Sequence, residues 1–180
     1  IVTQKWDLSC GAATLSIILT YYLGDPISEP EVIGEILKRA DPARVRARKG
    51  FSLLDMKKFA ETRGYAAEGY AQMTLADLTE YAPAIVPLNF NQGFDHFMVF
   101  LGIHGDRVLL ADPAWGNRTM QFRRFEAAWR KIAFVVRRPG GAAQSSQLDV
   151  RPELFAVPNE LAVQNTISRS ALSVPLPRVQ

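Results

Sequence analysis

Three residue types that together support nucleophilic catalysis are spread along this 180-residue chain. Cys10 is its single cysteine, and it lies where a polar N-terminal stretch gives way to an apolar run. A thiol at a helix N-terminus is close to unpaired backbone N–H groups and to the positive end of the helix dipole, and both favour the thiolate. Cys10 is therefore a candidate nucleophile if a base and an orienting group lie nearby. The alternative is an inert buried thiol, the usual state of a free cysteine.

The two histidines, His96 and His104, lie at opposite ends of a nearly continuous apolar run. This run, residues 95–103, predicts a central β-strand that is covered on both faces. Eight extended residues would separate the two histidines by about 26 Å, so one site cannot use both. His104 adjoins Gly105-Asp106, a hairpin turn signal, and we expect it to be an exposed turn residue. His96 is the candidate base.

The strand that follows this turn ends at Asp112. Antiparallel pairing about the turn would bring Asp112 next to His96 across the two strands. Alone, Asp112-Pro113 would be an ordinary turn start. Together with Cys10 and His96 it predicts a nucleophile, a base and an orienting carboxylate.

Helix capping signals dominate the first half of the chain. Residues 41–50 are expected to be a polar, arginine-rich connection. The helix that follows Ser28 is expected to direct Val32, Ile33, Ile36 and Leu37 inward. The predicted elements of this half are helices from Cys10 to about Leu23, from the cap at Ser28, from Ser52 to Gly64 and from Thr74 through Tyr81, with a short strand over residues 65–70.

The second half changes to the periodicity of strands. Pro87 predicts an edge or a bulge in its strand. The predicted elements are strands over residues 84–90, 95–103, 107–112, 117–121 and 132–136, with a short helix over residues 122–129. The fold class is therefore α+β, with N-terminal helices packed against a C-terminal antiparallel sheet. We expect one domain over residues 1–138 and a proline-containing C-terminal extension over residues 139–180, partly ordered or docked on the core.

Composition narrows the classes of partner. The apolar fraction of 48%, the charged fraction of 22% and the net charge of +3 are typical of a globular protein, and the short arginine clusters do not predict a nucleic-acid partner. No apolar run approaches the roughly 18 residues of a transmembrane segment. One cysteine excludes an internal disulfide and a cysteine-based zinc site, and we expect neither metal nor cofactor. Because the chain starts at Ile1, we expect a missing upstream piece, either a removed signal peptide or an arbitrary boundary.

The motifs also carry a resemblance. Gln4 followed after six residues by Cys10-Gly11-Ala12-Ala13, then Asp95-His96-Phe97 and Asp112-Pro113-Ala114-Trp115-Gly116, resemble the C39 family of papain-like cysteine peptidases over residues 2–137. These double-glycine peptidases trim leader peptides from bacteriocin and related precursors. The resemblance implies a papain-like fold in which Cys10 is the nucleophile, His96 the general base and acid, Asp112 the orienting residue and Gln4 the oxyanion donor. From the residues alone, a surface residue on a frayed terminus is the preferred interpretation of Gln4, and an amide that donates to the oxyanion is the alternative.

The resemblance further implies a stand-alone member, because the chain has neither membrane spans nor a phosphate-binding loop. Such members often follow a signal peptide, so the implied location is the periplasm or the outside of the cell, with the cytoplasm as the alternative. The implied partners are a small secreted peptide or an exported fibre-forming protein, and an export apparatus. Ser9 departs from the family, which commonly has aspartate before the cysteine, but a serine can still cap the helix.

The expected activity is hydrolysis of a precursor after a Gly-Gly leader, through a thioester. Trp6 and Trp115 flank the candidate site in sequence, and they are either walls of a narrow glycine channel or ordinary core aromatics. A non-cleaving module that binds the leader or precursor and assists export is the alternative function. Acyl transfer to an amine, and trimming of the chain's own tail at Gly140-Gly141, are further alternatives.

Overall fold

A computed structural model describes residues 8–48, 50–90 and 95–140. Within these ranges, six strands form one antiparallel sheet in the order β1-β6-β2-β3-β4-β5. The strands are β1 (Ala66–Tyr70), β2 (Ala84–Leu88), β3 (His96–His104), β4 (Arg107–Asp112), β5 (Gly116–Gln121) and β6 (Ala133–Arg137). The helices are α1 (Leu8–Ile17), which continues as a π-helical turn η1 (Ile18–Tyr22), α2 (Glu29–Leu37), α3 (Pro42–Arg48), α4 (Leu53–Thr62), α5 (Leu75–Glu80) and α6 (Phe122–Ala128).

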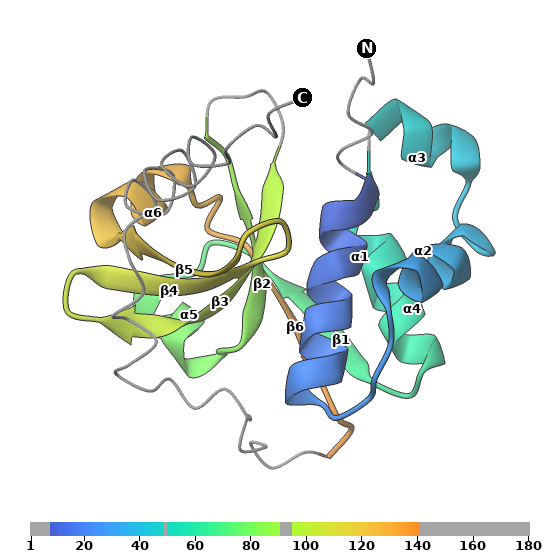
Figure 1. Ribbon diagram of the computed structural model, residues 1–180, viewed down its shortest axis with the longest axis horizontal. Helices are drawn as coiled ribbons and strands as arrows, with labels where there is room; N and C mark the ends of the chain where they lie inside the picture. The colour runs from blue at the N-terminus through green and yellow to red at the C-terminus, as the bar shows by residue number, and fades with distance from the viewer. Residues whose placement is uncertain (1–7, 49, 91–94, 141–180) are drawn as a thin grey trace, which may run out of the picture.

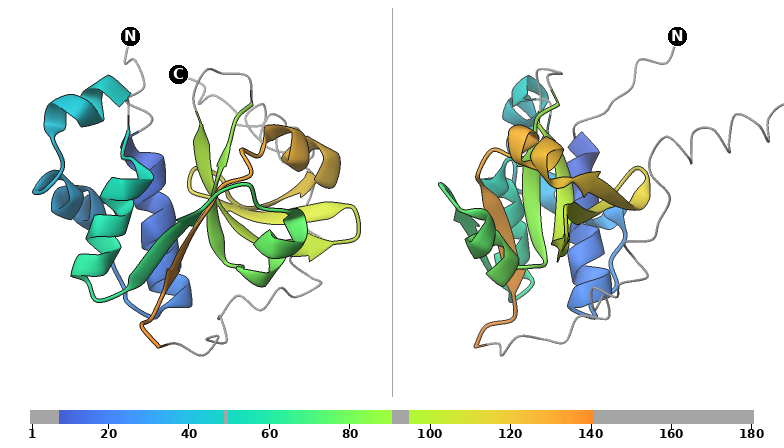
Figure 2. Two further views of the ribbon diagram at one scale, coloured as in Figure 1. Left: turned by 180° about the vertical axis from the view of Figure 1, so that it is seen from behind. Right: turned by 90° about the vertical axis from the view of Figure 1, so that its left-hand side faces the viewer.

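The sheet separates two groups of helices. Figure 1 shows α1, α2 and α4 grouped on one side, with α5 and α6 on the other, and the view from behind in Figure 2 agrees. Each side has its own buried core. The first core joins α1, α2 and α4 to the sheet through residues such as Leu15, Ile36, Phe59, Val99 and Phe134. The second joins α5 and α6 to the opposite face through residues such as Leu78, Met98, Phe100, Leu110 and Phe125.

Both faces of β3 are therefore covered, as its continuous apolar sequence predicted. Val99 belongs to the first core and Phe100 to the second. The α+β class, with N-terminal helices packed against an antiparallel sheet, is confirmed. Within the described part of the chain, no helix is both long and apolar enough to cross a membrane. The predicted extension over residues 139–180 lies, apart from its first two residues, outside the described ranges.

The capping signals located three helices correctly: α2, α4 and α5. Ser28, Ser52 and Thr74 each form a capping box with an acidic residue three positions later. The expected polar connection over residues 41–50 is wrong, because α3 forms there. The side chain of Asp41 accepts a hydrogen bond from the Ala43 N–H at the start of that helix. Val45 alone buries its side chain, so α3 leaves no helical periodicity in the sequence.

One further expectation is wrong and another is wrong in part. Leu37 was expected to point inward, but it ends α2 with a side chain that is exposed. Pro87 was expected to mark an edge or a bulge, and it does not mark an edge, because β2 lies inside the sheet, between β6 and β3. The pairing on the β6 side is instead irregular beside the proline: it contains Ile85↔Phe134 and then, past Pro87, an isolated bridge, Leu88↔Trp129. An interrupted ladder tolerates a residue that has no N–H to donate.

Close packing holds the N-terminus of α1 in place. A Cβ added at Gly11 would lie 3.1 Å from Sδ of Met56 on α4, and Met56 is fully buried. The first turn of α1 therefore approaches α4 so closely that a side chain at residue 11 would require Met56 to shift by a few tenths of an ångström. This contact positions Cys10, the residue before Gly11.

Candidate active site

Cys10 lies in the first turn of α1, as the sequence predicted. Its backbone N–H is among the first four of the helix, which have no acceptor within the helix. Ser9 does not cap this helix, because α1 begins at Leu8 and Ser9 lies inside it. The Cys10 Sγ atom lies 3.3 Å from Nδ1 of His96, a residue 86 positions later in the chain. The structure therefore brings a helix N-terminus and the first residue of β3 into contact.

Asp112 lies on the other side of the same imidazole. Its Oδ1 is 3.3 Å from Nε2 of His96, and it also accepts a hydrogen bond of 2.9 Å from the Ala114 N–H. The Asp112 side chain is 1% exposed, whereas that of His96 is 22% exposed. The three side chains form one continuous chain of contacts, from the thiol through both ring nitrogens to a buried carboxylate.

A β-bulge between β3 and β4 makes this contact possible. From the turn as far as Gly102↔Leu109, even-numbered residues of β3 face odd-numbered residues of β4. The register shifts between Phe100 and Gly102, and beyond that shift even faces even, as in Phe100↔Leu110. Paired residues on adjacent strands point to the same face of the sheet. A register shift of one residue therefore reverses which residues of the two strands share a face.

The bulge therefore places His96 and Asp112 on the same face. Regular pairing about the turn at Gly105 would have placed them on opposite faces. Gly102 has φ 153°, a conformation that residues with a side chain rarely adopt. The sequence predicted the contact between the two residues but not the bulge that it requires.

The structure adds Arg118, which the sequence did not indicate. Its Nη1 donates a hydrogen bond of 2.9 Å to Oδ2 of Asp112, and its side chain is 17% exposed. Arg118 lies on β5 opposite Leu110, and so it shares the face of Asp112. No signal in the sequence distinguishes Arg118 from the other polar residues of this short strand, residues 116–121.

The contacts shift the proton equilibria of the histidine and the aspartate. Burial opposes the charged form of His96, but the hydrogen bonds that its ring donates to Asp112 and Cys10, together with their negative charges, outweigh burial and raise the pKa of His96 to about 9. Burial also opposes the ionised form of Asp112, but hydrogen bonds from His96, the Ala114 N–H and Arg118 hold the pKa of that carboxyl below its usual range. At neutral pH the pair is therefore an imidazolium and a carboxylate.

This electrostatic arrangement predicts a pH profile. We expect kcat/KM to fall as pH rises through about 9, because His96 then loses the proton that it must donate. In Asp112→Asn the amide keeps the shape of the side chain but removes the charge that holds this proton. The basic limb should then move to lower pH by at least about one unit. Kinetics between pH 5 and 11 would measure both limbs, and an unmoved basic limb in the folded variant would contradict the assignment.

The structure describes only some of the remaining predicted site residues. Gln4 and Trp6 lie outside the described residues. Trp115 lies on the loop that follows Asp112 and is 73% exposed, so the core-aromatic alternative is wrong for it. His104 is exposed at the far end of β3, beside the turn, as expected. Among the described residues, no group of three or more His, Cys, Asp or Glu side chains has the arrangement of a metal site.

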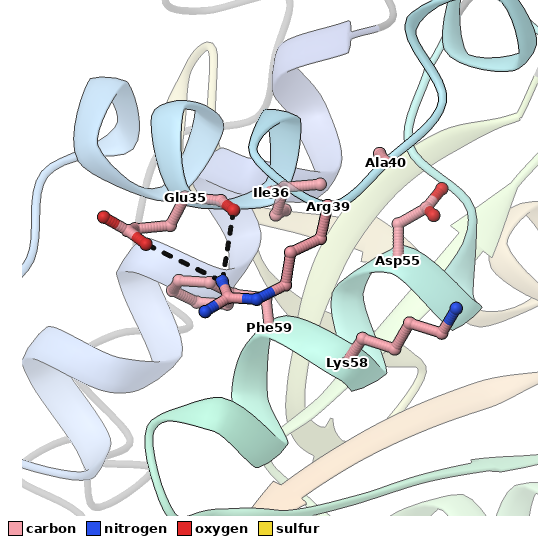
Figure 3. Close-up of a pocket in the computed structure, with 7 residues that line it drawn as sticks. All are labelled: Glu35, Ile36, Arg39, Ala40, Asp55, Lys58 and Phe59. Atoms are coloured by element: carbon pink, nitrogen blue, oxygen red, sulfur yellow. Dashed lines mark hydrogen bonds and ion pairs between the residues drawn. The ribbon is translucent and has the colours of Figure 1, made fainter.

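A pocket between α2 and α4 is unrelated to this site. Figure 3 shows Arg39 reaching across it to Glu35, with Phe59 below and Asp55 and Lys58 along α4. The cavity has a volume of about 10 Å³, at the lower limit for one water molecule. It is too small for a substrate, and Cys10 is not among the residues that line it.

Comparisons with known proteins agree with the geometry. The sequence profile of the Peptidase C39 family matches residues 1–140. Probable functional amyloid protease FapD of Pseudomonas aeruginosa is 37% identical over 170 residues, which cover 94% of this chain and 71% of that protein.

Two solved structures share the fold, and they confirm the expected papain-like architecture. A double glycine motif protease from an AMS/PCAT transporter, in complex with the leader peptide, superposes with a TM-score of 0.60 at 26% identity, covering 77% of this chain and 90% of that one. The peptidase domain of Streptococcus ComA superposes with a TM-score of 0.60 at 21% identity, covering 72% and 91%. The match to the family profile and the identity to FapD show that this chain belongs to the Peptidase C39 family and is a cysteine peptidase.

Proposed function

We propose that this peptidase is an endopeptidase that cuts a secreted or exported precursor after a Gly-Gly leader, through a thioester acyl-enzyme. The observation that carries the proposal is the chain of contacts from Cys10 Sγ through His96 to Asp112. A module that only binds a leader would need neither the contact between thiol and imidazole nor a buried carboxylate behind it. The contacts therefore favour cleavage over the non-cleaving alternative.

In the proposed mechanism, the Cys10 thiolate attacks the carbonyl carbon of the scissile bond. The Cys10 backbone N–H and the side chain of Gln4 donate hydrogen bonds to the oxyanion that forms. His96 gives its proton to the leaving amine, the C–N bond breaks, and a thioester remains on Cys10. Neutral His96 then takes a proton from water, the resulting hydroxide displaces the thiolate, and the carboxylic acid product leaves. Asp112 orients the imidazole through Nε2 in both steps.

The proposed substrate class draws on the relatives. One of the two solved structures is of a double glycine motif protease in complex with the leader peptide, which supports a leader-bearing precursor here. The relative in Pseudomonas aeruginosa carries the name functional amyloid protease, which supports an exported fibre-forming protein as the precursor. A protein that acts on exported precursors would work in the periplasm or outside the cell, close to an export apparatus.

Glycine selectivity would follow from a narrow channel beside the nucleophile. We propose that exposed Trp115, on the loop that carries Asp112, forms one wall of this channel, and that Trp6 forms another. Tryptophan suits such a wall, because its ring offers a large apolar surface and its N–H a hydrogen-bond donor. Trp115→Ala would then raise KM with little change in kcat.

The experiment is to incubate the protein with a peptide that carries a double-glycine leader and to identify the products by mass spectrometry. We expect one cut, on the C-terminal side of the Gly-Gly pair. A matched peptide with Ala-Ala in place of Gly-Gly should be cut about 10- to 200-fold more slowly. Cys10→Ala and His96→Ala serve as controls. Intact peptide in every sample, or equal cleavage of both peptides, would refute the proposed specificity.

A further inference from the structure

Among the described residues, the Asp112 carboxylate contacts two cationic side chains, and only one of them takes part in the proposed reaction. His96 contacts Oδ1 from β3, and Arg118 contacts Oδ2 from β5. The bulge in β3 and the regular register between β4 and β5 place all three side chains on one face of adjacent strands. Asp112 therefore lies between a histidine that titrates and a guanidinium that is always charged.

The burial of this group makes its charge balance important. The side chains of Asp112 and Arg118 are 1% and 17% exposed, whereas the surface pair Glu35 and Lys38 is 38% and 66% exposed. Solvent screens the surface pair strongly and the buried pair much less. Burying a carboxylate without a counter-ion costs free energy. Without a permanent counter-ion, Asp112 would therefore strongly stabilise the protonated form of a neighbouring base.

The proposed mechanism needs that proton to leave. His96 is an imidazolium before bond cleavage and a neutral imidazole after it has protonated the leaving amine. If His96 were the only cation on Asp112, its neutral form would leave the carboxylate buried and uncompensated. Arg118 keeps its charge throughout, so it can balance Asp112 at the moment when His96 becomes neutral.

We propose that Arg118 is a positioning residue of the site: it holds the Asp112 carboxylate through Oδ2 and shares its charge, so that His96 can release its proton within the reaction cycle. The inference rests on the proposed roles of Cys10, His96 and Asp112. In the described part of the chain, the charged and titratable groups that contact Asp112 are His96 and Arg118, and those that contact His96 are Asp112 and Cys10 from α1.

The competing explanation is that Arg118 only ties β5 to β4. That role would make Arg118 matter for the free energy of unfolding but would leave the titration of His96 unchanged. The proposed role makes a different prediction. When the positive charge of Arg118 is removed, the carboxylate attracts the His96 proton more strongly, so His96 should titrate at higher pH.

The test compares Arg118→Gln, which keeps a hydrogen-bond donor but loses the charge, with Arg118→Lys, which keeps the charge. The matched control is Arg107→Gln, because Arg107 lies at the other end of β4 and donates to Thr119 on β5. The chain has two histidines, so NMR of histidine-labelled protein gives two imidazole titrations, and His104→Gln assigns them.

We expect the His96 midpoint to rise by at least about half a pH unit in Arg118→Gln and to stay at the wild-type value in Arg118→Lys and Arg107→Gln. With a cleaved peptide, Arg118→Gln should lower kcat about tenfold at neutral pH with little change in KM, because a weaker acid protonates the amine more slowly. An unchanged or lower His96 midpoint in folded Arg118→Gln would overturn the inference. The titration needs no substrate, so a shifted midpoint in a protein that cuts no double-glycine peptide would refute the proposed substrate and leave the electrostatic role of Arg118 standing.

Discussion

Cys10→Ser is expected to lower kcat/KM by at least about 10⁴-fold, because the substitution removes the nucleophile but little of the structure. A serine hydroxyl next to an imidazolium stays protonated, whereas a thiol readily transfers its proton to the imidazole. Cys10 also lies in the first turn of α1, where its side chain fills little of either core. The free energy of unfolding should therefore stay within about 1 kcal/mol of wild type.

The measurement is kcat/KM on a leader peptide, together with urea unfolding of both proteins. Because Cys10 is the single cysteine, a thiol alkylating reagent should add one group to the wild-type protein and none to the variant. His96→Gln should lose a similar share of activity, whereas His104→Gln, at the far end of β3, should keep it. A Cys10→Ser protein that cleaves at near the wild-type rate would show that another residue is the nucleophile.

Gly102→Val is expected to lower kcat/KM by about 100-fold, although residue 102 touches neither the thiol nor the imidazole. Gly102 has φ 153° at the bulge, and a β-branched residue there would be strained. The strain should cost about 1–3 kcal/mol in the free energy of unfolding. Relief of that strain requires a change in the bulge, and the bulge is what keeps His96 and Asp112 on one face of the sheet.

Gly105→Ala is the matched control on the same hairpin. Gly105 has φ 58° in the turn, and no atom lies within 4 Å of an added Cβ, so alanine would cost stability through the backbone alone. We expect a loss of about 1–2 kcal/mol with kcat/KM close to wild type, because the turn lies at the other end of the strands. If Gly102→Val and Gly105→Ala lost stability to a similar extent and both kept full activity, the bulge would have no role in catalysis.

The local elements were largely predictable, because their signals are local. Ser28, Ser52 and Thr74 begin helices through contacts that span three residues, and Gly105-Asp106 forms the turn that its composition predicts. The helix α3 was missed because Val45 alone is buried, so no apolar stripe marks it. Leu37 and Pro87 were misplaced because neighbouring elements decide which end of a helix is covered and which side of a strand is paired.

The sequence by itself determined the chemistry of the site: one thiol at a helix start, one histidine at the head of a buried strand and one aspartate at the end of the next. These follow from residue types and local periodicity. Only the tertiary structure decided how the three meet. A bulge at Leu101 sets which face of β4 His96 shares, and pairing with β5 brings Arg118 to the second oxygen of Asp112. Register and counter-ions depend on contacts between distant segments, and a single sequence does not display those contacts.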